Sequence, residues 1–288
     1  MKIDENLAAV HAYLCADGYV TTNNKWKYYR AGLRNTNLIL LEDFQERFEK
    51  VFGSKPTIRK DRRCEKCSKE IYEKLTEKFG SFYSWEWRMP KLNLKLSRIW
   101  LRAYFDCEGW VFCKKRQNRH IGVDCVNEIG LNQVIDALNR LGIKSVKKFN
   151  AKRKIYRILI YSKENLQRFK DKVGFLHPEK NKKLNEVLED FVVYEWDFPK
   201  NVKKCKKFVF NLLKDKTRIK KPRYARIISR EEVNLKRLQK LLKEFFDVES
   251  NYHKSVNGIG TIYYELNINR KEEVKKLIKL GLIPNLFK

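Results

Sequence analysis

The sequence predicts an α+β fold made of repeated units, each combining helices with a small antiparallel sheet. Two apolar stretches, LAAVHAYLCADGYV at 7–20 and LSRIWLRAYFDCEGWVF at 96–112, both carry an acid followed by a glycine near their end. Strand-like and helix-like runs follow each stretch in the same order, and the last 90 residues repeat that order again. These observations divide the chain into expected units at 1–90, 91–198 and 199–288.

The order of elements in the first two units follows from periodicity. Aromatic and β-branched residues in 25–37 predict a strand, and the apolar spacing of 38–53 predicts an amphipathic helix. The second unit repeats this pair with a strand at 119–129 and a helix at 130–142. Further strand-like runs and a second helix complete each unit. Each unit therefore reads as a leading helix followed by ββαββα.

The two leading helices place acids and small residues at matching positions. Asp17 aligns with Glu108, and the glycines that follow, Gly18 and Gly109, can take the left-handed conformation that ends a helix. Small side chains spaced by four lie on one helix face, where two backbones could approach closely. These small residues are Ala12, Ala16, Ala103 and Cys107. Two ordinary core helices would explain that face, but not an acid placed twice at the negative end of a helix dipole.

The charge of the chain indicates a polyanionic partner. Its 64 Lys and Arg against 35 Asp and Glu give a net charge of +29, while 43% hydrophobic residues allow a folded core. No apolar run reaches the roughly 18 residues that span a bilayer, and the N-terminal sequence lacks a signal-peptide pattern. We therefore expect nucleic acid rather than a membrane as the partner, and a cytoplasmic location in a prokaryote or an organelle. The alternative is a merely lysine-rich surface.

The seven cysteines predict neither a disulfide framework nor a complete zinc site. Their number is odd and no secretion signal precedes them, which disfavours disulfides. Cys64 and Cys67 form a C-x-x-C pair, but a structural zinc site normally needs four ligands, and neither a second pair nor a nearby histidine supplies the rest.

The paired motifs carry a family resemblance. AYLCADGYV at 12–20 and AYFDCEGWV at 103–111, each leading a ββαββα unit, resemble the motifs of the LAGLIDADG homing endonucleases in their single-chain, two-motif form. VGFLHPEKNKKLNEVL at 173–188 is similar to the segment that closes such a domain. The resemblance covers about 5–190. It implies a pseudo-twofold arrangement with the motif helices side by side, and two antiparallel sheets that form a DNA-binding saddle.

The resemblance also implies a role for the two acids. In the family, the acid at this place in each motif ligates the catalytic divalent metal, which assigns Asp17 and Glu108 as catalytic and metal-binding residues. Two close carboxylates repel each other unless a cation neutralises them, and Mg²⁺ suits such hard ligands because it keeps waters and accepts phosphate oxygens. Asp106 is a weaker candidate because its counterpart in the first motif is Cys15.

The expected activity is site-specific cleavage of both strands of double-stranded DNA. The resemblance implies an enzyme of the intron-encoded kind, acting as a monomer on a long asymmetric site. Residues near the ends of strands are candidates for the periphery of the active site: Asn35, Asn127, Lys114 and Lys115.

We expect the β-strands to bind the DNA and recognise its sequence, because their basic and amide side chains can contact phosphates and base edges. The candidates are Lys25, Lys27, Tyr29, Arg30, Arg34, Arg116, Gln117, Arg119, Lys147, Lys148, Lys152 and Arg153.

The last expected unit is a basic, degenerate copy. Its leading helix would be KKFVFNLLKDK at 206–216, with Asp215 in the place of Asp17 and Glu108, and with Phe210 and Lys214 in the places of small residues. Twelve Lys or Arg and one acid lie between positions 203 and 230, so this segment is expected to touch phosphates. An unrelated α+β tail is the alternative.

A second function fits the same fold. A non-catalytic nucleic-acid-binding protein, such as an RNA maturase or a transcription regulator, could also use these units. The presence of both acids favours the endonuclease.

Overall fold

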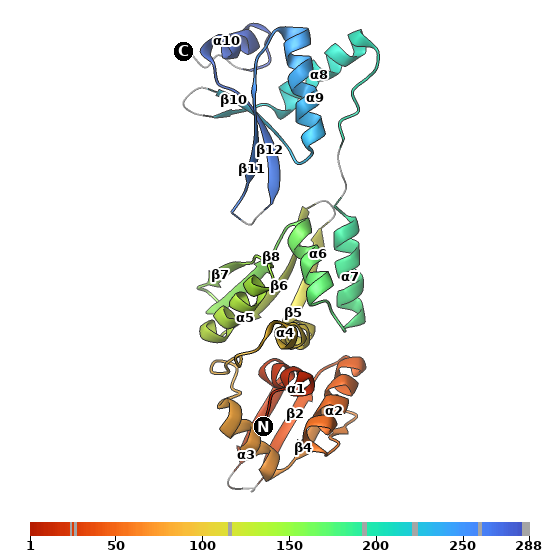
Figure 1. Ribbon diagram of the computed structural model, residues 1–288, viewed down its shortest axis with the longest axis vertical. Helices are drawn as coiled ribbons and strands as arrows, with labels where there is room; N and C mark the ends of the chain where they lie inside the picture. Colours follow the sequence, from red (N-terminus) through yellow and green to blue (C-terminus); the bar gives the residue numbers. More distant parts are fainter. Residues whose placement is uncertain are drawn as a thin grey trace. The chain divides into compact units, whose positions relative to one another are not determined.

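The computed structural model describes residues 1–23, 25, 28–114, 117–191, 195–220, 224–258 and 261–283, without the side chains of Gln117 and Lys220. The chain forms two compact units, Met1–Phe191 and Val192–Lys288. Figure 1 shows that each unit combines helices with antiparallel strands. No helix among the described residues is long and apolar enough to cross a membrane.

The first unit contains two copies of one arrangement. The first copy consists of α1 (Glu5–Cys15), β1 (Gly18–Asn23), β2 (Tyr28–Arg34), α2 (Leu38–Phe52), β3 (Thr57–Ile58), β4 (Arg63–Cys67) and α3 (Lys69–Phe79). The second copy consists of α4 (Leu94–Glu108), β5 (Gly109–Lys114), β6 (Gln117–Cys125), α5 (Glu128–Arg140), β7 (Val146–Asn150), β8 (Ile155–Ile160) and α6 (Lys163–Lys172). A further helix, α7 (Pro178–Glu189), follows.

The sheets of the two copies share one topology. Their strands are antiparallel and follow the orders β1-β2-β4-β3 and β5-β6-β8-β7. The middle helix of each copy begins at an asparagine, Asn37 for α2 and Asn127 for α5, whose side chain accepts a hydrogen bond from a backbone N–H of the first turn. The duplicated αββαββα order and the antiparallel sheets confirm the predicted α+β class.

The core of the first unit lies around the two leading helices. Helices α1 and α4 pack against each other more extensively than any other pair of helices in the structure, and Figure 1 shows them between the two sheets. Ala12 and Ala103 are almost fully buried at 0% and 3% exposure. The indole Nε1 of Trp100 donates a buried 3.0 Å hydrogen bond to His11 Nδ1, which joins α4 to α1. Small residues and one satisfied polar pair thus hold the helices together.

The second unit repeats the same arrangement a third time. It consists of α8 (Val202–Lys216), β9 (Arg218–Lys220), β10 (Tyr224–Ser229), α9 (Glu232–Phe246), β11 (Asn251–Val256), β12 (Ile262–Ile268) and α10 (Lys271–Lys279). Its antiparallel strands follow the order β9-β10-β12-β11, the same as in the other copies. Its own core includes Val209, Leu213, Ile227 and Leu266. A third α+β unit was predicted, and its topology makes it a third copy.

One recurring contact aligns the three copies residue by residue. Before each middle helix, a side chain accepts a hydrogen bond from the backbone N–H two residues later. The pairs are Asn35 with Asn37 (2.8 Å), Cys125 with Asn127 (3.3 Å) and Ser229 with Glu231 (3.1 Å). Two residues before each acceptor lies a fully buried strand residue, namely Leu33, Val123 and Ile227.

This alignment corrects the predicted place of Asp215. Gly18 pairs with Leu33 in the first copy, as Gly109 pairs with Val123 in the second. In the third copy, Arg218 pairs with Arg226, so one further step of the same register brings Thr217 opposite Ile227. The residue before Thr217 is Lys216. Lys216, and not Asp215, therefore occupies the position of the motif acid.

Candidate functional site

The two motif acids lie where the paired helices end. Asp17 follows the last turn of α1, and Glu108 is the final residue of α4; both are half-buried. The small residues predicted to form the helix contact all belong to one core cluster or pack against it: Ala12, Ala16, Ala103 and Cys107. The close packing of α1 on α4 therefore brings the two acids to one region.

The glycines after the acids are required for a reason other than the predicted one. Neither Gly18 nor Gly109 has a positive φ, and Gly109 is extended at φ −74° because a strand begins there directly. A Cβ on Gly18 would lie 2.7 Å from the carbonyl oxygen of Tyr13, and one on Gly109 would overlap the carbonyl oxygen of Phe105. The expected left-handed caps are therefore wrong, and glycine instead permits a tight turn from helix to strand.

The charges of the two acids interact. The pKa of Glu108 is raised to about 7, first by burial and then by the negative charge of Asp17, with a smaller contribution from Asp124 and with Lys180 opposing the shift. Desolvation and a like charge both disfavour the ionised carboxylate. The ionised pair of acids is therefore unfavourable without a nearby positive charge, and a bound cation would stabilise it.

Asn35 holds the carboxylate of Asp17. Its Nδ2 donates a 2.7 Å hydrogen bond to Asp17 Oδ2 and lies 3.9 Å from the Sγ of Cys107 on the other motif helix. Its Oδ1 accepts from the backbone of Asn37, so both ends of the amide are fixed. A cavity of about 460 Å³ opens here, lined by Asp17, Arg34, Asn35, Thr36, Asp61, Arg62, Asp106, Cys107, His177 and Lys180.

Asn127 does not have the position that its place after the second strand suggested. It is 2% exposed, donates to the carbonyl oxygen of Trp87 at 2.6 Å and accepts from the backbone of Gly130 at 2.9 Å. It begins α5 as Asn37 begins α2, so the true counterpart of Asn35 is Cys125. The surroundings of Asp17 and Glu108 are therefore chemically different.

The carboxylate of Asp106 is engaged in hydrogen bonds to the backbone of the segment before α7. Its two carboxylate oxygens accept backbone hydrogen bonds from Leu176 at 3.1 Å and His177 at 2.9 Å. Burial raises the pKa of Asp106 to about 6, while these two hydrogen bonds oppose the shift. Asp106 thus anchors the segment that leads into α7.

Lys180 is a site residue that the sequence analysis did not single out. Its Nζ donates to the last carbonyl oxygens of α4, those of Phe105 (3.3 Å), Asp106 (2.6 Å) and Cys107 (3.0 Å). These carbonyls lack partners within the helix and carry the negative end of its dipole. The segment 173–188 was recognised as the closing segment, but its spacing gives no sign that it returns to the motif helix.

The predicted DNA-contacting residues fall into three groups. Three have their polar or aromatic groups engaged elsewhere: Tyr29 packs on Tyr72 of α3, Arg119 pairs with Asp190 and Phe191, and Lys147 bonds Glu128 and Asn132. The described residues without such engagement are Arg34, Lys148, Lys152 and Arg153, while Arg30 stacks on Tyr28 and Lys25 lies in the β1–β2 turn. Lys27 and Arg116 lie outside the described residues, as does the side chain of Gln117. Of the two lysines predicted at the periphery of the active site, Lys114 is exposed at the end of β5 and Lys115 lies outside the described residues.

The C-x-x-C pair does not present two thiols together. Cys64 is buried on β4 and Cys67 is exposed at the end of the same strand. Burial raises the pKa of Cys64 to about 12. Cys64 therefore contributes to the core as a small apolar residue.

Comparisons with known proteins identify the repeated unit. The model of the LAGLIDADG-like domain matches residues 4–80 and 95–174, which together are more than half of the chain. A Methanocaldococcus jannaschii protein named replication factor C small subunit is 30% identical over 201 residues, which are 65% of this chain and 10% of that protein. The homing endonuclease I-ApeI of Aeropyrum pernix is 31% identical over 97 residues, 33% of this chain and 42% of that enzyme.

A comparison with solved structures also finds a homing endonuclease. The crystal structure of I-DmoI in complex with DNA and Ca has a TM-score of 0.45 and 18% identity, covering 63% of this chain and 99% of that one. The chain spans about a tenth of the length of the first curated relative. From the two matched regions, the chain belongs to the LAGLIDADG homing endonuclease family, in the form that carries both motifs in one polypeptide.

Proposed function

We propose that the protein is a site-specific DNA endonuclease that uses a divalent metal held by Asp17 and Glu108. The observation that carries the proposal is the position of these two acids. One lies at the end of each paired motif helix, and the charge of Asp17 acts on Glu108. The alternative, a non-catalytic nucleic-acid binder, gives no reason to keep two repelling carboxylates at one place.

The donor set fits Mg²⁺. Both ligands are carboxylates, which hard cations prefer. Among the described residues, no group of three or more His, Cys, Asp or Glu is arranged to hold a metal. Two acids alone suit an ion that keeps several waters and accepts substrate phosphate oxygens. When bound, such an ion would stabilise charge on the phosphoryl oxygens and make water a better nucleophile.

Residues of the chain prepare this site before any ion binds. Asn35 fixes one rotamer of Asp17 through its 2.7 Å hydrogen bond. Lys180 caps the end of α4 immediately before Glu108. Helix α1 packs on helix α4 through buried residues that include Ala12 and Ala103, and this contact sets how closely the two acids approach each other. This preorganisation means that the carboxylates need little rearrangement when phosphate and ion arrive.

The substrate we propose is a long, asymmetric site in double-stranded DNA, bound by a monomer. One chain already carries both motif acids, so no second copy is needed to complete the pair. The halves differ next to the acids, with Asn35 beside Asp17 and Cys125 in the equivalent place. Unlike halves favour a DNA site whose two halves also differ.

The test is a selection from a randomised duplex library with Mg²⁺, scored separately for cleavage and for retention. Asp17→Asn and Glu108→Gln should each abolish or severely reduce cleavage while retention persists. Asp61→Asn is the matched control, because Asp61 is an acid that lines the same cavity but belongs to neither motif and forms an exposed ion pair with Arg63. Retention without cleavage by the unmodified protein would instead support the non-catalytic binder.

A further inference from the structure

The third copy carries a cation where the other two copies carry an acid. The strand register places Lys216 at the position of Asp17 and Glu108. The same offset is supported by the buried face of α8, because its buried residues Cys205, Val209 and Leu213 then match the buried Ser97, Leu101 and Phe105 of α4. A carboxylate pair with a metal can hold a phosphate; a lysine can attract one directly, as a point charge.

The third copy also lacks the surface that pairs the motif helices. The positions of Ala12 and Ala16 correspond on α8 to Asn211 and Asp215, and both are exposed. Polar, exposed side chains at these places cannot form the dry contact that joins α1 to α4. The end of α8 is therefore free to meet another partner.

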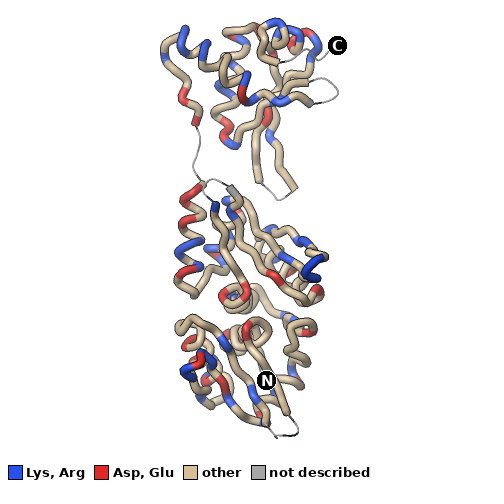
Figure 2. Tube along the Cα trace, turned by 180° about the vertical axis from the view of Figure 1, so that it is seen from behind, with Lys and Arg blue, Asp and Glu red and all other residues tan. Residues whose placement is uncertain are grey.

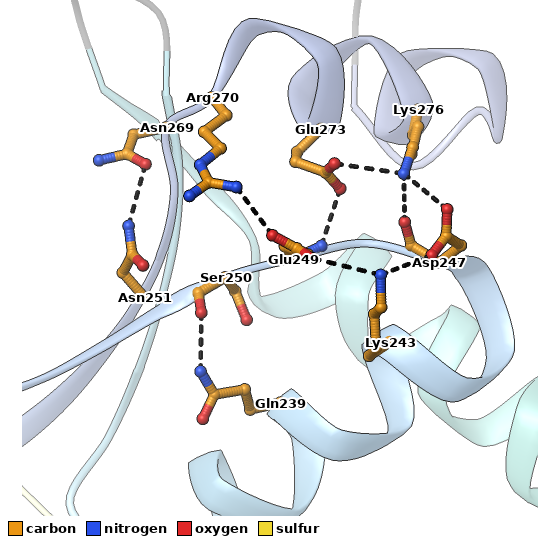
Figure 3. A network of polar contacts seen from close by, with 10 residues as sticks. All are labelled: Gln239, Lys243, Asp247, Glu249, Ser250, Asn251, Asn269, Arg270, Glu273 and Lys276. Carbon is orange, nitrogen blue, oxygen red and sulfur yellow. Dashed lines mark hydrogen bonds and ion pairs between the residues drawn. The ribbon is translucent and has the colours of Figure 1, made fainter.

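The charges of the second unit are distributed unevenly. Around α9, β11 and α10, acids and bases pair: Lys243 with Asp247 and Glu249, Arg270 with Glu249, and Lys276 with Asp247 and Glu273 (Figure 3). On α8 and β9, by contrast, none of the Lys and Arg residues whose side chains the structure describes forms an ion pair with another described residue; Lys220 is not among them. Figure 2 shows Lys and Arg recurring along this part of the chain, where 203–230 contains one acid.

This imbalance identifies which face of the unit would meet a polyanion. Cations that already pair with carboxylates would have to break those pairs to bind phosphate. The cations of α8 and β9 have no such competitor, so their field extends into solvent. Lys216 and Arg218 are both exposed and lie two residues apart across the junction of the helix and the strand.

We propose that the junction of α8 and β9 is a metal-independent phosphate-binding site for duplex DNA, with Lys216 in the position that a metal-ligating acid occupies in the catalytic copies. This inference rests on the proposed DNA endonuclease function and deepens it. The third copy would keep the fold and the position at which a phosphate is contacted, but it would bind DNA without catalysing cleavage. Its occupant is the phosphate backbone of duplex DNA, since exposed Lys and Arg without acidic partners offer charge and no pocket for bases.

The experiment uses the full chain and measures duplex affinity in EDTA over a range of salt concentrations. Changing Lys216→Gln together with Arg218→Gln should weaken binding and reduce the slope of log K against log salt by about 1.8, or about 0.9 for each lost phosphate contact. Lys216→Arg should keep the slope of the unmodified protein, because the charge is retained. Lys275→Gln is the matched control, since Lys275 is an exposed lysine on α10 of the same unit.

Three results would overturn the inference. One is an unchanged slope in the double variant with its melting temperature intact. Another is a slope reduced by about 0.9 in Lys275→Gln, half the effect of the double variant, which would reflect net charge and not a defined face. The third is a loss confined to single-stranded or duplex RNA. Duplex affinity in EDTA is measured without any cleavage. If Asp17→Asn failed to stop cleavage, that result would contradict the proposed catalytic role of Asp17 but not the phosphate-binding site on the third copy.

Discussion

The side-chain amide of Asn35 donates a 2.7 Å hydrogen bond to the carboxylate of Asp17, and its other end is held by the backbone of Asn37. The first motif acid is therefore oriented by a neighbour that is itself fixed. Among the described residues, no side-chain amide donates to Glu108, and Cys125 stands in the place equivalent to Asn35. The two acids share a position in the fold but not a set of partners.

Replacing Asn35 with alanine should slow cleavage. The variant removes the donor that fixes Asp17, and loss of such supporting residues around metal ligands typically costs about 10–100-fold in activity or metal affinity. Rates measured over a range of Mg²⁺ concentrations would separate a loss of affinity from a loss of maximal rate. Asn127→Ala is the control, since Asn127 caps α5 and touches neither acid. Its expected effect is a stability loss of about 0.5–2 kcal/mol, and equal cleavage defects in both variants would contradict the role of Asn35.

Replacing Lys180 with methionine should destabilise the first unit. The change leaves the carbonyl oxygens of Phe105, Asp106 and Cys107 without their shared donor at the negative end of α4. Unmet buried acceptors cost about 1–3 kcal/mol, which chemical denaturation can measure. Lys182→Met changes an exposed lysine of the same helix and should be nearly neutral. Equal stabilities for the two variants would show that the cap contributes nothing.

Replacing Ala12 or Ala103 with leucine should also destabilise the fold. Both residues are buried where α1 packs on α4, at 0% and 3% exposure, and adding three carbons to each would force the helices apart. Overpacking of this kind costs about 1–3 kcal/mol. The control is Arg98→Leu, at an exposed position of α4. Thermal melting should separate the control from the two core variants, and similar melting temperatures would argue against a tight helix contact.

The order of elements could be predicted from the sequence because periodicity is a local property. The leading helices of all three copies and the middle helices of the first two lie close to their expected ranges, and the α+β class follows from their order. The resemblance between AYLCADGYV and AYFDCEGWV also led to the family that the comparisons identify. Patterns that repeat within the chain were therefore the most informative ones.

The positions that depend on register or tertiary contact could not be predicted in the same way. Asp215 was chosen because it is an acid, whereas the strand pairing selects its neighbour Lys216. Asn127 was chosen because it lies near the end of a strand, as Asn35 does. An asparagine at that place can either cap the following helix, as Asn127 does, or reach the motif acid, as Asn35 does. Lys180 contacts the end of α4 from a helix more than seventy residues later, which no spacing rule predicts.

The buried pair of His11 and Trp100 predicts an acid sensitivity of the first unit. Burial lowers the pKa of His11 from 6.5 to about 3, because a charged imidazole would lose its hydration between the two motif helices. Its Nδ1 must also stay unprotonated to accept the 3.0 Å hydrogen bond from Trp100. The folded state therefore binds this proton less tightly than the unfolded state does. The stabilisation is fully present above pH 6.5 and is lost as the pH falls toward 3.

The expected size of the effect is about 2 kcal/mol of unfolding free energy between pH 6.5 and pH 5, at about 1.4 kcal/mol for each pH unit. The raised pKa values of Asp106 and Glu108 act in the opposite direction, since their contribution to stability is lost as the pH rises. The unmodified protein should therefore be compared with His11→Gln, which keeps both acids but cannot titrate at position 11. The unmodified protein should be the more stable of the two at pH 7, and the difference between the two unfolding free energies should shrink as the pH is lowered. Only the unmodified protein loses stability when the imidazole of position 11 becomes protonated in the unfolded state. A difference that stays constant from pH 7 to pH 5 would mean that His11 does not control the acid stability of the helix pair.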